Sequence, residues 1–156
     1  MIDELYSAHI LKLAANLPHA GRLPAPDGTG ERVAKLCGSK AVVDVGLDAD
    51  GRIAAFAQDI KACALGQAAA GVLGESVIGA TVAEIEAARD ATLAMLKTGG
   101  DGPTGRFEGL RALKQVADYP ARHASTLVAI EATLEAVHAA LARKALDTRT
   151  SLAGAA

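Results

Sequence analysis

Apolar positions change their spacing along the chain, which divides it into a helical start, a strand-rich middle and a helical remainder. Over residues 2–17, apolar side chains recur every three or four positions, so we predict an amphipathic helix that ends at Pro18. Residues 18–30 are rich in proline and glycine and predict a loop without regular structure. The chain therefore begins with one helix and a long connection.

Three short strands are predicted in the middle of the chain. A first strand ends at residues 37–39, and the alternating pattern over residues 41–47 predicts a second. The turn at residues 48–51 ends in a glycine that tolerates positive φ, so residues 52–58 return as a third strand antiparallel to the second. Together these segments predict a small antiparallel sheet.

Helical periodicity dominates the rest of the chain and predicts about four helices. They cover residues 64–78, a helix from the capping box Thr81–Glu84 to Lys97, a short helix over 107–116, and a last helix that starts at Pro120 and carries Leu127 to Leu141. The order predicts an α+β fold with an N-terminal helix, a three-stranded antiparallel sheet and helices packed on one face. We expect one domain over residues 1–146 and a frayed tail over 147–156.

Three glycines interrupt the predicted helix over residues 64–78. Gly66, Gly71 and Gly74 each cost roughly 0.5–1 kcal/mol relative to alanine in a helix interior. Such a cost indicates that something approaches the helix closely. Tight packing against the sheet and room for a partner or cluster both explain it.

Composition narrows the class of protein. Of the 156 residues, 51% are hydrophobic but only 3% are aromatic, so the core must be built from aliphatic side chains. The formal net charge is −2, and acidic and basic residues are interspersed along the chain. The sequence therefore shows no cluster of basic residues of the kind that binds nucleic acid or an anionic membrane. The start of the chain lacks a signal-peptide pattern, and no apolar run approaches the ~20 residues of a membrane span. We therefore expect a cytoplasmic protein that binds neither nucleic acid nor membrane.

The two cysteines are the main candidates for chemistry. Cys63 lies where strand-like spacing changes to helix-like spacing, and the positive end of a helix favours the thiolate form that binds metal or attacks sulfur. Cys37 lies in the turn between the first two strands, and a meander can bring the two thiols together for a soft metal or an iron–sulfur cluster. With 25 residues between them, the cysteines match no compact zinc pattern, so buried inert thiols are the alternative.

Five segments carry a family resemblance that runs from about Tyr6 to Leu141. They are residues 37–39, 61–68, 77–81, 95–97 and 119–127. In this order they resemble the U-type iron–sulfur cluster assembly scaffold family, which includes IscU, SufU and the NifU N-terminal domain. The resemblance implies a scaffold that receives sulfur from a cysteine desulfurase and builds clusters for apo iron–sulfur proteins. For the SufU-like branch it implies a zinc protein that accepts persulfide sulfur.

The resemblance also implies a site with four ligands, of which this chain keeps two. Cys37 matches the cysteine of the family's Cys-Gly-Asp turn, and Cys63 matches the cysteine that enters a helix. The family's aspartate falls on Ser39, and its third cysteine falls on Ser125. A neutral serine is a poor ligand for iron or zinc compared with thiolate or carboxylate. The ligand set is therefore degenerate at Ser39 and Ser125.

Three additions could complete the site. His123 could supply a nitrogen, Asp59 could supply a carboxylate, or a homodimer could share one cluster through Cys37 and Cys63 of each copy. His123 stands two residues before Ser125 on a predicted helix, so the two side chains should point in different directions. A surface or capping histidine is the alternative for this residue.

Three functions follow from these features. The first is a scaffold or carrier that binds an iron–sulfur cluster or zinc through Cys37 and Cys63. The second is an enzyme-like sulfur acceptor in which Cys63 receives a persulfide. The third is an interaction protein that keeps the fold and binds no cofactor. A scaffold without enzymatic activity is the leading hypothesis.

Overall fold

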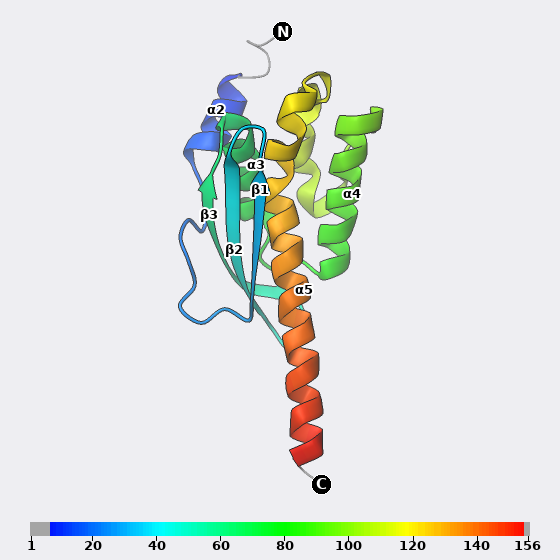
Figure 1. Ribbon diagram of the computed structural model, residues 1–156. Coiled ribbons are helices and arrows are strands. Elements are labelled where there is room, and N and C mark those ends of the chain that lie inside the picture. The colour runs from blue at the N-terminus through cyan, green and yellow to red at the C-terminus, as the bar shows by residue number, and fades with distance from the viewer. Residues whose placement is uncertain (1–6, 155–156) are drawn as a thin grey trace.

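The fold is a three-stranded sheet with helices on one face (Figure 1). The computed structural model describes residues 7–154, with side chains up to residue 150. Its elements are α2 (Ala8–Ala15), β1 (Gly28–Ala34), β2 (Ser39–Leu47), β3 (Ile53–Lys61), α3 (Ala64–Ser76), α4 (Val82–Thr98), the 3₁₀ helices η1 (Gly105–Asp118) and η2 (Pro120–Arg122), and α5 (His123–Gly154). This order confirms the predicted α+β fold class.

The first helix is shorter in the described chain than the apolar pattern predicts. Helix α2 begins at Ala8, and the Ser7 hydroxyl accepts a hydrogen bond from the backbone N–H of Ile10, as an N-cap does. The part of the predicted helix over residues 1–6 lies outside the described residues. Helix α2 packs mainly on α3 rather than on the sheet.

The sheet has the antiparallel order β1–β2–β3, as the sequence predicts. Its inner face carries buried Val43 and Val45, and helix α5 lies against β1 and β2 on this side (Figure 1). On the outer face, Val42 stands opposite Asp59 and Lys40 opposite Lys61. Because strand residues alternate between faces, this register decides which side chains share a site.

Strand β1 begins inside the segment that the sequence predicts as a loop. Its first residues, Gly28 and Gly30, let the backbone of α5 come very close. A Cβ atom on Gly28 would lie 2.1 Å from the Ala136 carbonyl oxygen, and one on Gly30 would lie 2.1 Å from the Ala132 carbonyl oxygen. The glycines that indicated a loop are therefore strand residues required by helix packing. Strand β3 likewise runs three residues beyond its predicted end, to Lys61.

Close packing explains the three glycines of helix α3. A Cβ atom on Gly71 would lie 2.6 Å from the Leu13 carbonyl oxygen of α2, and one on Gly74 would lie 2.8 Å from the Gln58 side chain of β3. At Gly66 the close neighbours are the Ala62 Cβ atom, at 2.7 Å, and Ser125 of α5. Close packing therefore explains all three glycines, but the predicted packing against the sheet is found only at Gly74.

Later helices differ from the predictions mainly in type and length. The capping box of α4 is present, with Thr81 and Glu84 each bonded to the other's backbone N–H. Segment η1 is a 3₁₀ helix rather than an α-helix. Helix α5 continues past Asp147 to Gly154, where the sequence predicts a frayed tail, and residues 155–156 lie outside the described part.

Helix α5 forms the centre of the helical layer. By length and composition alone, Pro120–Thr150 could cross a membrane, but 67% of its most apolar window is buried inside the protein. The buried side is rich in alanine and lies on β1 and β2 (Figure 1). This helix is therefore a core helix whose apolar character serves packing.

A charged network fastens the connection before β1 to the outer face of the sheet. Asp44 of β2 is fully buried and accepts hydrogen bonds from the guanidinium of Arg22, the backbone N–H of Leu23 and the hydroxyl of Thr29. Burial alone would raise the pKa of Asp44, but these donors outweigh it and hold the pKa below its ordinary value. The carboxylate therefore stays ionised and holds the connection in place.

Candidate functional site

Both cysteines lie at one end of the sheet, where three segments meet. Cys37 is in the hairpin turn between β1 and β2, and Ser39 is the first residue of β2. Cys63 is the N-cap of α3, directly after β3. Ser125 lies in the first turn of α5, which starts at the same end of the molecule (Figure 1). The meander and the start of α5 therefore gather all four positions of the predicted ligand set.

Hydrogen bonds connect the four side chains in a row. The Cys37 sulfur lies 3.3 Å from the Ser39 hydroxyl, which lies 2.8 Å from the Ser125 hydroxyl, and the Cys63 sulfur lies 3.2 Å from that same Ser125 oxygen. Ser39 and Ser125 are buried, whereas Cys63 is half-buried and Cys37 is exposed. The hydroxyls form the floor of the site and the thiols form its solvent-facing rim.

Gly66 sets the position of Ser125. A Cβ atom on Gly66 would lie 2.9 Å from the Ser125 carbonyl oxygen and 3.1 Å from its hydroxyl oxygen. Any larger residue at this point of α3 would push the start of α5 away from Cys63. Gly66, three residues after Cys63, therefore lets Ser125 lie close to the start of α3.

The surroundings of Cys37 favour its thiolate. A hydrogen bond from the Ser39 hydroxyl is the main cause that lowers the pKa of Cys37 below its ordinary value. Partial burial opposes this effect, while the Ser39 backbone N–H, the Ser125 hydroxyl and the positive charge of Arg122 add to it. A lowered pKa raises the fraction of thiolate, which is the form of cysteine that binds metals or attacks electrophiles.

His123 is buried, and one of its ring nitrogens is already in use. Its Nε2 lies 2.9 Å from the Val116 carbonyl oxygen and 3.2 Å from that of Ala117. Carbonyl oxygens only accept, so Nε2 must carry the proton and donate. Its Nδ1 is buried and has no hydrogen-bond partner among the described residues. Of the expected surface or capping histidine, the surface position is wrong, whereas Nε2 does cap carbonyl oxygens at the end of η1, and only Nδ1 would be available to a metal.

Asp59 lies on the other side of the sheet from the cysteine site. It is exposed and stands opposite Val42 on the outer face, whereas Ser39 points to the inner face. Within residues 7–150, no three His, Cys, Asp or Glu side chains come close enough to hold a metal ion together. Among the described residues, the site therefore brings two thiols together without a third such side chain close enough to share a metal ion with them.

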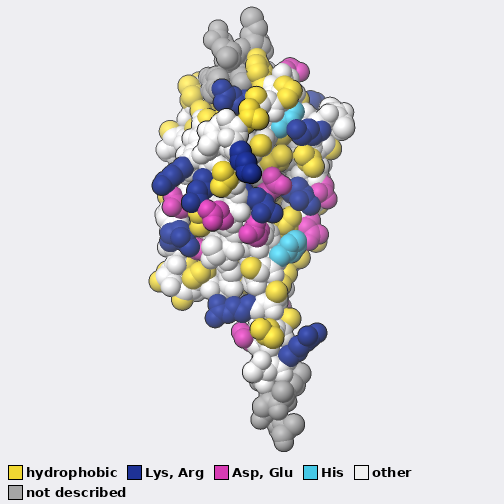
Figure 2. All heavy atoms as spheres, in the orientation of Figure 1, with side chains coloured by type: hydrophobic (Ala, Val, Ile, Leu, Met, Phe, Trp, Pro, Cys, Tyr) yellow, Lys and Arg dark blue, Asp and Glu magenta, His cyan; other side chains and the backbone are white. Residues whose placement is uncertain are grey.

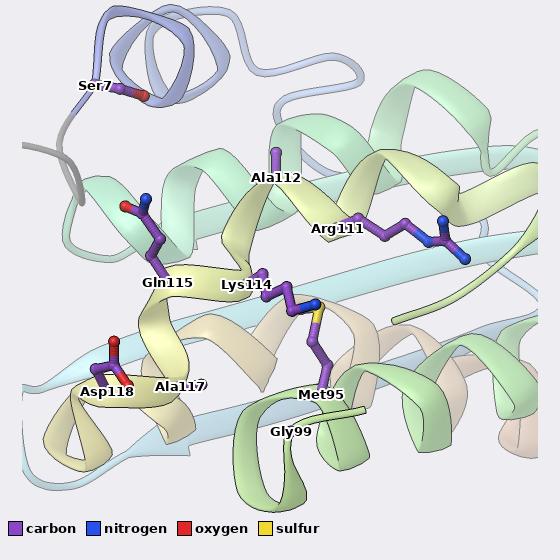
Figure 3. Close-up of a pocket in the computed structure, with 9 residues that line it drawn as sticks. All are labelled: Ser7, Met95, Gly99, Arg111, Ala112, Lys114, Gln115, Ala117 and Asp118. Carbon is purple, nitrogen blue, oxygen red and sulfur yellow. The ribbon is translucent and has the colours of Figure 1, made fainter. Parts of the chain in front are cut away.

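A separate cavity of about 800 Å³ lies between the end of α4 and η1 (Figure 3). Its wall includes Met95, Arg111 and Lys114, and Ser7 closes one side. None of the predicted site residues lines it.

On the face shown in Figure 2, acidic and basic side chains are intermingled.

Two features of the structure were beyond the sequence analysis. The network around Asp44 joins residues 15 to 22 positions apart, and no local pattern marks it. The effect of Arg122 on Cys37 depends on how α5 begins beside the β1–β2 hairpin. The five segments of the family resemblance were the signal that could place Arg122 at this end.

The order of helix, antiparallel sheet and helices, with one thiol in the β1–β2 turn and one at the start of α3, is an α+β architecture that fits a scaffold of iron–sulfur cluster assembly. The NifU-like N-terminal domain family matches residues 5–126, and the chain belongs to this family of iron–sulfur cluster assembly scaffolds. No curated protein matches the chain.

Solved structures similar to the chain include the following two. An N-terminal domain of a nitrogen-fixing NifU-like protein from Brucella abortus is 43% identical over 89% of this chain and 96% of its own, with a TM-score of 0.86. A protein from Fervidobacterium islandicum AW-1, assigned to iron–sulfur cluster assembly in the SUF system, is 20% identical over 85% of this chain and 96% of its own, with a TM-score of 0.77. The second likeness is one of fold.

Proposed function

We propose that this protein is a variant U-type scaffold or carrier of the cytoplasm. It receives sulfur from a cysteine desulfurase, binds an iron–sulfur cluster or a metal ion through Cys37 and Cys63, and passes its cargo to apo iron–sulfur proteins. The observation that carries this proposal is the row of contacts from Cys37 through Ser39 and Ser125 to Cys63, which brings both thiols to the end of the sheet where the resemblance places the ligands.

The donor set fits such cargo in part. Thiolates are the ligands of iron–sulfur clusters and suit soft metals, and Cys37 and Cys63 supply two. Ser39 and Ser125 are neutral and bonded to one another, so they support the thiols rather than replace the missing ligands. The chain alone therefore offers half of a full ligand set.

Anaerobic reconstitution tests the proposal. Iron and sulfide added to the apo protein should give visible absorption, and Cys37→Ser and Cys63→Ser should each abolish it. Ser7→Ala, at the start of α2, is the matched control and should keep the absorption. A wild-type protein that stays colourless and free of metal in every oligomeric state would contradict cluster binding.

A persulfide acceptor is the second candidate, and the position of Cys63 favours it. This half-exposed thiol belongs to the N-cap residue of α3 and makes no capping hydrogen bond. Its sulfur is therefore not tied to the backbone N–H groups at the start of the helix. The Cys63 thiolate would attack the outer sulfur of the desulfurase persulfide, form a new S–S bond and release the desulfurase thiolate. After incubation with the desulfurase, Cys63 should gain the mass of one sulfur atom. An unmodified Cys63 would argue against this candidate.

An interaction protein without cofactor is the third candidate, motivated by the two serines at ligand positions. Under this hypothesis Cys37→Ser and Cys63→Ser would leave the cellular activity of iron–sulfur enzymes unchanged, whereas loss of the whole protein would lower it. Reduced enzyme activity with either cysteine variant would favour the scaffold.

A further inference from the structure

The outer face of the sheet is covered only in part. The helices lie on the inner face, and the connection before β1 covers the outer face around Asp44 (Figure 1). Between Asp44 and the β1–β2 hairpin, six side chains point outward, and all of them are exposed except one that is half-buried. We call these residues the open face: Glu31, Val33, Lys40, the half-buried Val42, Asp59 and Lys61.

The strand register arranges the open face in two rows of opposite charge. The row nearer the hairpin consists of Val33, Lys40 and Lys61, and the next row consists of Glu31, Val42 and Asp59. One row therefore carries two cations and the other carries two anions. Like charges directly opposite one another on neighbouring strands destabilise a sheet, so Lys40 and Lys61 do not stabilise each other.

Only the β1 side of the open face is neutralised within the chain. Lys40 and Glu31 form an ion pair, with 2.9 Å between Nζ and Oε1. Lys61 and Asp59 form no ion pair with any of the described residues. The β3 side therefore presents one cation and one anion to a partner.

Apolar side chains are exposed next to these charges. Val33 of the open face is 54% exposed, and Leu36 at the tip of the β1–β2 hairpin is 81% exposed. Large apolar side chains gain free energy when a partner removes them from water. This end of the sheet thus combines apolar area with unpaired charges of both signs.

We propose that the open face is a contact between two copies of this chain, packed sheet against sheet. A two-fold axis that runs across the strands, between the two rows, places the cationic row of each copy over the anionic row of the other. Lys61 of each copy then pairs with Asp59 of the other copy, and Val33 and Val42 of both copies meet in the centre. Face-to-face packing of two sheets, about 10 Å apart, accommodates side chains of this length.

The connection over Asp44 fixes where this axis lies. The connection is raised above the outer face on the side away from the hairpin, so the axis carries it past the hairpin tip of the other copy, beside Leu36. An axis moved onto the cationic row would place lysines against lysines. An axis moved toward the connection would make the connection collide with the other sheet. Charge and shape therefore favour the same arrangement.

The contact is small, so the dimer should be weak. A standard interface uses about 20–30 residues on each side, whereas the open face offers six. Exposed ion pairs contribute little, and salt screens them. We therefore expect an equilibrium of monomer and dimer that shifts to the monomer when the protein is diluted or salt is added.

Sedimentation equilibrium of the full chain tests the proposal, with the thiols kept reduced and protein concentrations up to about 1 mM. Lys61→Glu and Asp59→Lys should each raise the dissociation constant of the dimer at least about tenfold, because two attractive pairs become repulsive. Lys114→Glu on η1, in the helical layer, is the matched control and should leave the dissociation constant unchanged.

Combined variants separate lost charge pairing from a damaged fold. Lys61→Glu/Asp59→Lys restores opposite charges across the axis and should return the dissociation constant to within about threefold of the wild-type value. An equal mixture of the two single variants should form a heterodimer, although each variant alone stays monomeric under the same conditions.

The opposite results are equally clear. A wild-type protein that stays monomeric at every concentration in low salt would overturn the proposal, and the open face would then be left to a different partner. A dimer that is unaffected by Lys61→Glu, or that the double variant does not restore, would place the contact elsewhere on the molecule and also overturn it. Because these measurements need neither metal nor sulfide, their failure would leave the proposed function untouched.

Discussion

At the scale of single residues, Ser39 and Ser125 place neutral hydroxyls between the two thiols of the site. The hydrogen bond between Ser39 and Ser125 closes the floor, and each hydroxyl also meets a thiol. Where the family resemblance implies anionic ligands at all four positions, this chain has two thiols supported by two neutral hydroxyls. The sequence indicated this substitution, but it could not show that the two hydroxyls bond to one another, because they lie 86 positions apart.

The reactivity of Cys37 should follow the hydrogen bonds that stabilise its thiolate. In a Cys63→Ser background, iodoacetamide should alkylate Cys37 with a pH midpoint below that of a free cysteine, because the pKa of Cys37 is lowered chiefly by Ser39. Adding Ser39→Ala should move this midpoint upward, so that alkylation at neutral pH becomes slower.

Ser125→Ala in the same background is the comparison variant, since the Ser125 hydroxyl contributes less than Ser39 to the lowered pKa of Cys37. Its midpoint should move less. Equal midpoints with and without Ser39 would mean that the hydroxyl does not stabilise the thiolate.

At the scale of elements, packing decides where the strands begin. Gly30→Ala should destabilise the protein by about 1–3 kcal/mol, because the new Cβ would lie 2.1 Å from a backbone oxygen of α5 that cannot move alone. Urea unfolding at neutral pH measures the loss.

Gly100→Ala provides the control for this test. The nearest atoms to a Cβ there are 3.3 Å away, so its loss of stability should be clearly smaller. Equal effects of the two substitutions would indicate that β1 and α5 are not in close contact.

The connection before β1 should make stability depend on pH through Asp44. Its folded pKa lies below the unfolded value, so its stabilisation is present above the unfolded pKa and is lost as pH falls through the folded pKa. Asp44→Asn should therefore lower the free energy of unfolding at pH 7 by roughly 2–3 kcal/mol, since charged hydrogen bonds are lost. The difference from wild type should shrink in acid, where the wild-type carboxyl is also neutral.

Denaturant unfolding at several pH values checks this expectation. Asp59→Asn is the matched control, because that carboxylate is exposed on the same face of the sheet. It should change stability by less than about 0.5 kcal/mol at any pH. A constant difference for Asp44→Asn across the acidic range would refute the account of the buried carboxylate.

Element order was predictable because it depends on local spacing, whereas boundaries depend on distant contacts. The capping box at Thr81 and the turn at Gly51 carry their own signals in the sequence. The start of β1 does not, since Gly28 and Gly30 resemble a loop until α5 is placed beside them. For the same reason the sequence could name Cys37 and Cys63 but could not show that Asp59 faces away from them.

At the scale of the whole molecule, the fold brings one end of the sheet, the start of α3 and the start of α5 together (Figure 1). Close contacts at Gly66 and Gly30 hold α5 against α3 and β1, so the Ser125 hydroxyl contacts Cys63 directly and Cys37 through Ser39. The protein therefore keeps the architecture of the scaffold family and brings its two thiols to one end of the sheet.

The metal and acid-labile sulfide content of protein purified without oxygen tests this account most directly. We predict iron with an equal amount of sulfide in the wild-type protein, and neither in Cys37→Ser or Cys63→Ser. Zinc without sulfide, bound through the same cysteines, would favour the persulfide-accepting candidate. A folded wild-type protein that contains no iron, sulfide or zinc would contradict the claim that Cys37 and Cys63 form a cargo-binding site.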